Sequence, residues 1–316
     1  MERLYPDLTF DEPVFDAHMH VVDTDSLHML VEIGESFGVK KSLLICHSLG
    51  AKKYAEESFP GRFVFAKYFS GAMRFGGGLE TILKEISTLR EEGYHLAKMQ
   101  SAPVMRGRAS ANPDDLRMDD DDMARMFDAM RDEGIPFLLH LSDPDTYYAT
   151  RYTDRTIYAS KERDLDELEG VLRRHSDMKL QLAHFAAQSE IHRLGNLARW
   201  FDTYPNFIID TSSARWVSRE LSKNPKKARE FMIKYQDRIV FGTDCVTWGP
   251  DREYYVGRYL ALRLLLETDI EHRQLPFTDS DTVNSGGTFI NGLNLPKDVL
   301  QKIYWQNAQD FYSEFI

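Results

Sequence analysis

The chain has 316 residues, of which 42% are hydrophobic and 28% charged, as in ordinary globular proteins and unlike disordered or fibrous ones. Its 39 basic and 50 acidic side chains give a formal charge of −11, which disfavours nucleic acid as a partner. Two cysteines are too few for a disulfide scaffold and favour a reducing compartment. The N-terminus lacks the apolar core of a secretory signal, and no apolar run is long enough to span a membrane. We therefore expect a cytoplasmic protein, with homo-oligomerisation left open.

Eight short segments predict buried strands, because they are continuous apolar runs of the kind found in parallel sheets covered on both faces. They are Val14–His20, Lys41–His47, Phe63–Phe69, Tyr94–Gln100, Ile135–Leu141, Met178–Phe185, Phe207–Thr211 and Arg238–Asp244. Helical patterns lie between them, at Thr24–Gly38, Leu79–Glu92, Met118–Glu133, Leu165–Arg174, Glu190–Tyr204 and Pro225–Tyr235. Only the segment after the second strand, Ala51–Phe59, gives a short and weak helical pattern. This repeated alternation predicts an α/β fold of the (β/α)8 TIM-barrel class, and an open doubly wound sheet is its main rival.

The remaining segments predict long loops and a C-terminal extension. The connections Ser101–Arg117 and Ser142–Arg163 are long for plain turns. Beyond the eighth strand we expect a helix over Tyr254–Glu267, a loop rich in Gly, Asn and Ser, and a closing amphipathic helix over Pro296–Phe315. Because no linker or internal repeat divides the chain, we expect residues 1–316 to form a single domain.

Four histidines and an aspartate fall at the ends of predicted strands, namely His18, His20, His140, His184 and Asp244. His18 and His20 are two residues apart, so in a strand both side chains point to one side. Barrel enzymes build their sites at this end, from several strands. Nitrogen ligands with one oxygen and an open position suit a divalent metal such as zinc. Each of His140 and His184, taken alone, is equally compatible with a hydrogen-bonded core histidine.

The alternation of strand residues makes a further prediction about the barrel interior. If the site residues face inward, then Leu138 does so with His140, and Val240 does so with Asp244. By the same alternation, Leu180 and Leu182 would face inward with His184.

Several ordered motifs resemble the amidohydrolase superfamily, specifically the amidohydrolase-2 branch of metal-dependent barrel enzymes. They are FDAHMH, FLLHLSDP, QLAHFAA, FIIDTS, RIVFGTDC and the closing IYWQNAQDFY, and together they span essentially the whole chain. The resemblance implies an enzyme in which His18, His20, His140 and Asp244 hold the metal and His184 is an acid/base or second-metal ligand. It implies a hydrolase acting on a small carboxylated or cyclic molecule, or, as in some members, a non-oxidative decarboxylase. A non-catalytic barrel stabilised by metal is the third alternative.

Lys98, near the end of the fourth strand, leaves the number of metal ions open. Some relatives carry a carboxylated lysine there that bridges two metals, and others carry a similar lysine beside one; we expect one ion. In the hydrolytic mechanism Asp244 takes a proton from a metal-activated water, and His184 polarises the substrate carbonyl. In a decarboxylase Asp244 would instead protonate carbon.

Residues near the barrel mouth are candidate substrate contacts. Arg215, just past the seventh strand, could bind a substrate carboxylate, although a surface salt bridge is as good an interpretation. Lys98, Tyr147 and Trp248 are further candidates, and for Trp248 core packing is equally probable on sequence grounds. We expect His47 to be a packing residue.

Overall fold

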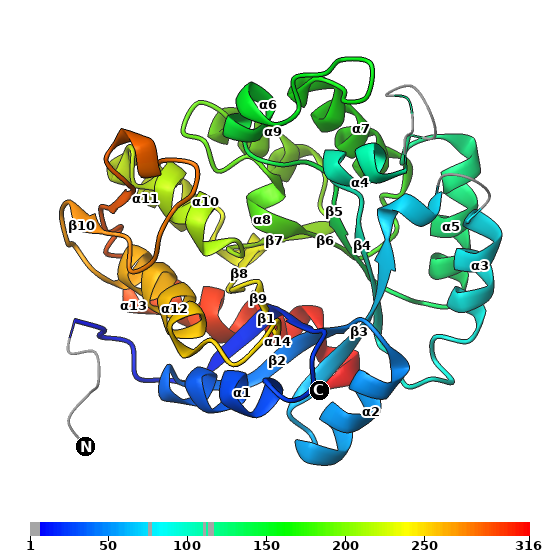
Figure 1. The fold of residues 1–316 in the computed structure, drawn as a ribbon, viewed down its shortest axis with the longest axis horizontal. Helices are drawn as coiled ribbons and strands as arrows, with labels where there is room; N and C mark the ends of the chain where they lie inside the picture. The colour runs from blue at the N-terminus through cyan, green and yellow to red at the C-terminus, as the bar shows by residue number, and fades with distance from the viewer. Residues whose placement is uncertain (1–6, 75–77, 110–111, 113–116) are drawn as a thin grey trace.

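A computed structural model describes residues 7–74, 78–109, 112 and 117–316, which form a mixed α/β fold around one curled sheet (Figure 1). The strands of this sheet are β1 (Val14–Val21), β2 (Val39–Cys46), β3 (Phe63–Ser70), β4 (Leu96–Gln100), β5 (Phe137–His140), β6 (Leu180–Leu182), β7 (Phe207–Asp210), β8 (Ile239–Val240) and β9 (Cys245–Val246). They lie in the order β8-β7-β6-β5-β4-β3-β2-β1-β9, and all their pairings are parallel. This consecutive order excludes the doubly wound rival, in which the strand order reverses.

The two ends of the sheet belong to neighbouring parts of the chain. Only four residues separate β8 from β9, and they hydrogen-bond to β1: the Ala17 amide donates to the Phe241 carbonyl, and the Asp244 amide donates to the His18 carbonyl, both at 2.8 Å. The strand predicted over Arg238–Asp244 is therefore wrong in its extent. It breaks after Val240, because Asp244 adopts a left-handed φ of 55°.

Helices lie around the curled sheet, most of them against its outer face (Figure 1). They are α1 (Leu27–Ser36), α2 (Leu49–Ser58), α3 (Leu79–Ser87), α4 (Pro103–Arg108), α5 (Asp121–Asp132), α6 (Asp145–Thr150), α7 (Lys161–Arg174), α8 (Ala183–Ala186), α9 (Leu194–Thr203), α10 (Ala214–Leu221), α11 (Pro225–Lys234), α12 (Arg252–Glu267), α13 (Lys297–Gln301) and α14 (Asn307–Phe311). After α12 comes an antiparallel hairpin of β10 (Arg273–Gln274) and β11 (Phe289–Ile290). Within the described residues, no helix is both long and apolar enough to cross a membrane.

Two helix predictions need correction. The segment after β2 is a full helix, α2, because the Ser48 side chain caps it by accepting a hydrogen bond from the Ala51 amide. The closing helix is not continuous: a π-helical turn, η4 (Lys302–Gln306), separates α13 from α14. Three short helices, α4, α6 and α10, occupy segments that were expected to be loops or were left unassigned.

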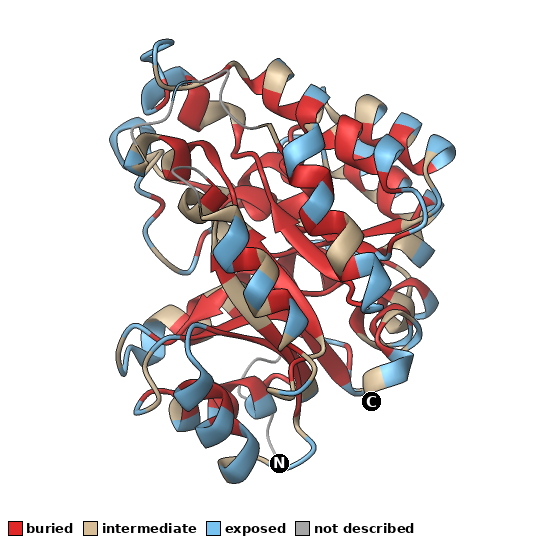
Figure 2. Cartoon of the chain, turned by 90° about the vertical axis from the view of Figure 1, so that its right-hand side faces the viewer, coloured by how far each residue is buried: buried red, intermediate tan, exposed pale blue. Residues whose placement is uncertain are grey.

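Apolar side chains pack on both sides of the sheet, whose strands are largely buried (Figure 2). The larger cluster lies between sheet and helices, and a smaller one fills the interior. The interior cluster includes Phe15 of β1, which stacks on Tyr312 after α14 with ring centroids 5.4 Å apart. The amino-terminal part of the interior is thus closed, and polar side chains can gather only at the carboxyl ends of the strands.

The predicted inward-facing partners of the site residues are correct for β5 and β8 but not for β6. Leu138 and Val240 lie in the interior cluster, as predicted. Leu180 and Leu182 were expected inside, and this was wrong: they belong to the outer cluster. Gln181 faces inward instead, where its side-chain amide donates to the Ala17 carbonyl at 3.1 Å.

Candidate metal centre

A β-bulge in β1 aims its two histidines at the same point. The pairing of β1 with β2 shifts register between Asp16 and Met19, while Ala17 still faces the interior and Met19 faces the helices. Because a bulge inserts one residue, the side chains beyond it change face. His18 and His20 therefore both point to the mouth of the sheet, with their Nε2 atoms 3.2 Å apart.

The Asp244 carboxylate completes this group from the other end of the sheet. Its Oδ1 lies 3.6 Å from Nε2 of His18 and 3.4 Å from Nε2 of His20. Burial by itself would raise the pKa of Asp244, but the hydrogen bond with His20 and the electrostatic interactions with His184, His18 and Arg258 hold it well below its ordinary value. Asp244 is therefore an ionised carboxylate facing two imidazoles.

His184 reaches the mouth although β6 ends two residues earlier. The chain turns left-handed there, with φ of 56° at His184, which reverses the side-chain direction expected from the strand. Its Nε2 lies 3.2 Å from Nδ1 of His140, the last residue of β5. The other nitrogen of His140 lies 3.0 Å from Oδ1 of Asp143, whose Oδ2 accepts from the Tyr152 hydroxyl at 2.5 Å. Asp143 thus fixes the ring of His140 with Nδ1 toward the cavity.

Asp210, which the sequence interpretation did not single out, orients two of these histidines from β7. Its Oδ2 accepts from Nδ1 of His18 at 2.9 Å and from the Gln181 amide at 2.7 Å, and its Oδ1 accepts from the His184 backbone amide at 2.9 Å. The hydroxyl of Ser212 lies 2.7 Å from Nδ1 of His184. Desolvation by itself would raise the pKa of Asp210, but the electrostatic interactions with His18 and His184 and these hydrogen bonds lower it by more, so Asp210 is ionised. The only signal in the sequence was its place at a strand end.

Two further groups lie against the β1 histidines. The amine of Lys98 is buried 3.4 Å from Nε2 of His18, and burial lowers its pKa to about 8 against the opposing effects of Asp210 and Asp244. His47 was expected only to pack. It does stack on Tyr68, but it also lines the cavity, with its Nε2 3.0 Å from Nδ1 of His20.

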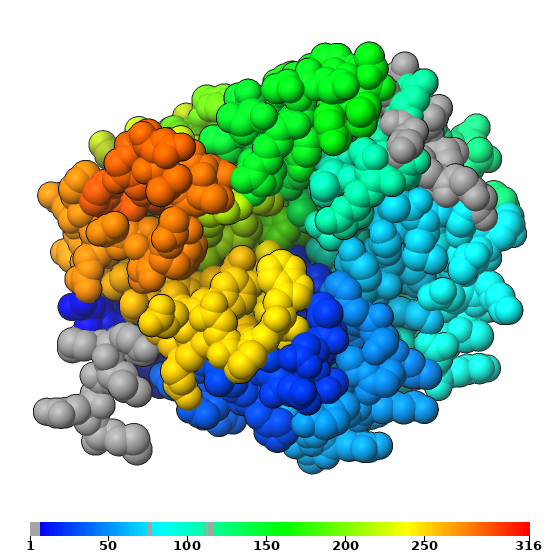
Figure 3. Space-filling model, in the orientation of Figure 1, coloured from blue at the N-terminus to red at the C-terminus, as the bar shows by residue number. Residues whose placement is uncertain are grey.

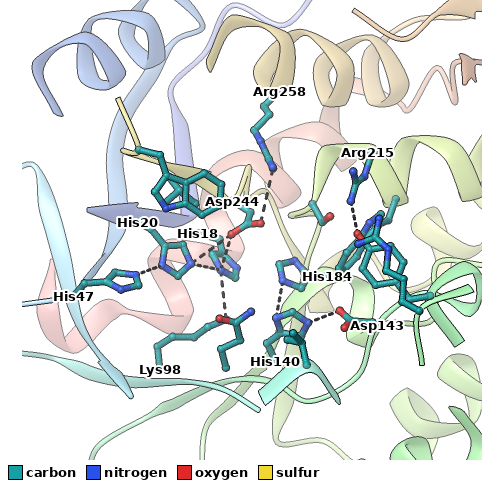
Figure 4. A pocket seen from close by; sticks show the side chains of 18 of the residues that line it. His18, His20, His47, Lys98, His140, Asp143, His184, Arg215, Asp244 and Arg258 are labelled. Atoms are coloured by element: carbon teal, nitrogen blue, oxygen red, sulfur yellow. Dashed lines mark hydrogen bonds and ion pairs between the residues drawn. The ribbon is translucent and has the colours of Figure 1, made fainter. Parts of the chain in front are cut away.

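These side chains surround a cavity of about 320 Å³, visible as a hollow near the centre of the face in Figure 3 and in close-up in Figure 4. All the predicted site residues line it: His18, His20, Lys98, His140, Tyr147, His184, Arg215, Asp244 and Trp248. Trp248 is 74% exposed, so it lies at the rim and the core-packing interpretation was wrong. Arg215 also forms an ion pair, with Nε 3.6 Å from the buried Asp279, so the salt bridge expected as its alternative role is present, and its contact with substrate stays a prediction.

The potential ligand atoms form two close groups in the described part of the chain. His18, His20 and Asp244 have ligand atoms within 4.8 Å of one another, and so do His18, His184 and Asp210. His140 belongs to neither group. The structure therefore brings three of the four predicted ligands together and places His140 on the same cavity, beside His184.

The family model described as Amidohydrolase matches residues 84–313, which is more than half of the chain. The chain belongs to the amidohydrolase family. No curated protein matches it. Among solved structures, it is similar to 5-carboxyvanillate decarboxylase LigW from Sphingomonas paucimobilis, with 13% identity, a TM-score of 0.53, and coverage of 95% of this chain and 99% of that one. It is also similar to 5-carboxyvanillate decarboxylase from Novosphingobium aromaticivorans complexed with manganese and 4-hydroxy-3-methoxy-5-nitrobenzoic acid, with 12% identity, a TM-score of 0.56, and coverage of 98% and 99%. At identities of 12% and 13%, the likeness shows a shared fold alone.

The donor set of this amidohydrolase-family member fits a divalent metal. An ionised carboxylate can only accept, so Nδ1 of His18 carries the proton that it donates to Asp210, and Nε2 has a free lone pair facing the site. Burial lowers the pKa of both His18 and His20, the latter to about 3, so both rings are neutral. Two neutral imidazoles and the ionised Asp244 are the protonation states that metal binding requires.

Proposed function

We propose that this chain is a metal-dependent hydrolase of small carboxylated or cyclic molecules. The observation that carries the proposal is the ionised Asp244 carboxylate, held 3.4–3.6 Å from the facing nitrogens of His18 and His20 in a cavity of about 320 Å³. A carboxylate so placed can bind a metal and also accept a proton from water. In this proposal the fold is a (β/α)8 barrel whose eighth strand is the interrupted segment from Ile239 to Val246.

His18, His20, Asp244 and His140 would hold one divalent metal ion, with zinc as our first choice. Bound there, the metal would supply Lewis-acid activation of water or of a substrate oxygen. The group of His18, His184 and Asp210 does not argue for a second ion, because both oxygens of Asp210 already accept hydrogen bonds from neutral donors.

The protein groups around this point divide the proton chemistry. Asp244 would accept the proton of the attacking water and return it to the leaving group, with Arg258 stabilising its ionised form from 3.8 Å. Nε2 of His184 lies on the opposite side of the cavity from His20, where it would donate to the substrate oxygen on which negative charge develops.

A non-oxidative decarboxylase is the second candidate, and the cations on the cavity wall favour it. Lys98, Arg151, Arg215 and Arg258 all line the cavity, a charge pattern suited to a carboxylated substrate. Both solved structures compared above are 5-carboxyvanillate decarboxylases. In that reaction Asp244 would deliver a proton to the carbon that loses carbon dioxide.

Isotopic water separates the two reactions. The chain, reconstituted with Zn²⁺ or with Mn²⁺, is incubated with carboxylated lactones, carboxylated amides and carboxylated phenols, once in H₂¹⁸O and once in D₂O. Hydrolysis incorporates one ¹⁸O into the product and releases no carbon dioxide. Decarboxylation releases one carbon dioxide and places one deuterium on the carbon it left.

The control variants are Asp244→Asn, which should abolish either reaction, and Arg252→Gln, which removes an exposed ion pair with Glu32 at 2.6 Å and should change neither. Stoichiometric release of carbon dioxide with no ¹⁸O incorporation would refute the hydrolase and establish the second candidate. Metal binding without turnover on any class of the panel would refute both, in favour of a metal-stabilised barrel.

A further inference from the structure

One wall of the cavity carries two arginines from different loops. Arg151 follows α6 and Arg215 lies in the first turn of α10, and both line the cavity. Tyr147 links them: the guanidinium of Arg151 stacks 3.7 Å from its ring centroid, and Arg215 donates a hydrogen bond to its hydroxyl. Arg151 and Arg215 therefore both contact one buried tyrosine side chain.

The loop between β10 and β11 holds both arginines from outside the barrel. Asp281 accepts from an Nη of Arg151 at 2.6 Å and lies 3.8 Å from Nε of Arg215. The Ser280 hydroxyl accepts a hydrogen bond from Nη1 of Arg215 at 2.8 Å. Asp281 is itself largely buried, so this contact orders both guanidinium groups before any ligand binds.

Buried contacts anchor this loop to the barrel. Asp279 is fully buried and lies 2.9 Å from the guanidinium of Arg219, one helical turn beyond Arg215 on α10. It also accepts from the hydroxyl of Thr288 at 2.7 Å. The position of the arginines is thus built into the fold.

The two arginines are set apart from the metal centre. In Figure 4 Arg215 lies on the far side of His184 from His18 and His20. Asp281 engages Arg151 through one nitrogen, and the carboxylates of Asp279 and Asp281 both lie beyond hydrogen-bonding range of Arg215, 3.6 and 3.8 Å from its Nε. Among the described residues neither arginine forms a bidentate pair with a carboxylate, the geometry that guanidinium groups favour for binding one.

We infer that Arg151 and Arg215 form an anion subsite for a second carboxylate of the substrate, and that Asp281 and Tyr147 position it. This inference rests on the proposed function, because the metal centre must bind the reacting end. It specifies the substrate class as a compact molecule with two anionic groups, one directed to the metal and one to the arginines. A substrate with a single anionic group would leave the guanidinium pair without a ligand.

The test compares two ligands of nearly equal shape that differ by one charge. Isophthalate carries two carboxylates, and 3-carbamoylbenzoate replaces one of them with a neutral amide. Their dissociation constants for the Mn²⁺-loaded full chain are measured by calorimetry. We expect isophthalate to bind about tenfold more tightly, the effect of one partly exposed charge-assisted pair.

Variants locate the origin of this preference. In Arg151→Gln or Arg215→Gln the preference should fall below about threefold, while affinity for 3-carbamoylbenzoate stays within about twofold. Arg252→Gln, which removes an exposed arginine that is not part of the cavity lining, should keep the full preference. If both variants fail to fold, Asp281→Asn serves instead. Its amide oxygen still accepts a hydrogen bond from Arg151 and so keeps the guanidinium in place, while the competing negative charge is removed, so the preference for isophthalate should rise by about threefold or more.

Each outcome decides a different point. Binding of both ligands with no preference, or a preference unchanged in both arginine variants or in Asp281→Asn, overturns the subsite and leaves the proposed function standing. If metal is bound but neither ligand binds, the proposed role of the metal centre fails, and the subsite inference fails with it.

Discussion

Replacing Asp210 with Asn tests whether a buried carboxylate sets the protonation of His18, the first of the proposed metal ligands. The Asn side chain has nearly the same shape but replaces one acceptor oxygen with an NH₂ donor. Placed at Oδ2, this donor would face Nδ1–H of His18 and the amide of Gln181. Placed at Oδ1, it would face the backbone amides of His184 and Ser212. In either orientation the NH₂ group of the new Asn faces two hydrogen-bond donors, and neither of these donors keeps its acceptor.

The magnitude follows from this count. Two buried donors without an acceptor cost about 1–3 kcal/mol each, so we expect Asp210→Asn to lower the free energy of unfolding by roughly 2–6 kcal/mol. With an amide NH₂ at Oδ2, His18 would regain a partner there by moving its proton from Nδ1 to Nε2. That change removes the lone pair that faces Asp244 and His20, so divalent-metal affinity should fall about 10–100-fold, as for other residues that orient metal ligands.

Metal affinity is measured by calorimetry with Mn²⁺ and Zn²⁺, and unfolding free energy by guanidinium denaturation of the metal-free chain. Asp16→Asn is the matched control. Asp16 is a buried aspartate like Asp210, but it lies on β1, and burial raises its pKa to about 7. Its Oδ2 accepts from the hydroxyls of Thr243 and Tyr259, and each hydroxyl can accept instead of donate when Asn places an NH₂ there. This control should keep its metal affinity within about threefold. If a folded Asp210→Asn variant does the same, the argument that Asp210 fixes the His18 tautomer is wrong.

Three further predictions concern separate parts of the molecule. Asp244→Asn should retain much of its metal but lose about 10²–10⁴-fold in kcat, whereas His18→Ala should lose both metal and turnover. Metal content and kcat are measured together, and near-normal turnover of Asp244→Asn would contradict this. Metal analysis and intact-mass measurement should find one ion per chain and an unmodified Lys98, and two ions with a carboxylated Lys98 would refute the mononuclear site. His175→Phe should lose less stability than the natural chain between pH 7 and pH 5. Burial against Phe127 lowers the pKa of His175 to about 4, so the unfolded chain binds a proton first as pH falls from about 6.5, and the natural chain loses stability. Thermal unfolding of both proteins at both pH values checks this, and an equal loss of stability in the two proteins would contradict it.

The sequence was sufficient to predict which strands carry the site. Each of the eight predicted strand segments contains a strand of the sheet, because apolar runs bounded by polar turns are a strong signal for buried parallel strands. The placement of His18, His20, His140, His184 and Asp244 on one cavity followed from a topological rule, that parallel strands present their carboxyl ends on one side.

What the sequence could not predict depends on backbone irregularities. The bulge in β1 and the left-handed turn at His184 each change which residues face the cavity, and neither carries a glycine or another local marker. The same holds for Asp210, whose role depends on hydrogen bonds to residues 26 to 192 positions away. The contacts of Arg151 and Arg215 depend on a hairpin loop remote in sequence, which no local pattern connects to the cavity.

These irregularities also locate the energetic cost of the site. His184, Ser213 and Asp244 all adopt left-handed backbone conformations that cost a non-glycine residue about 1–3 kcal/mol each. Two of them are held by hydrogen bonds to other site residues: the His184 amide donates to Asp210, and the Asp244 amide donates to the His18 carbonyl. The same hydrogen bonds that orient the side chains therefore offset the cost of the left-handed backbone. If the backbone relaxed at His184 or at Asp244, the candidate proton donor or metal ligand there would move out of place. A regular strand would relieve this strain, but it would direct His184 away from the cavity, as the outward Leu182 shows.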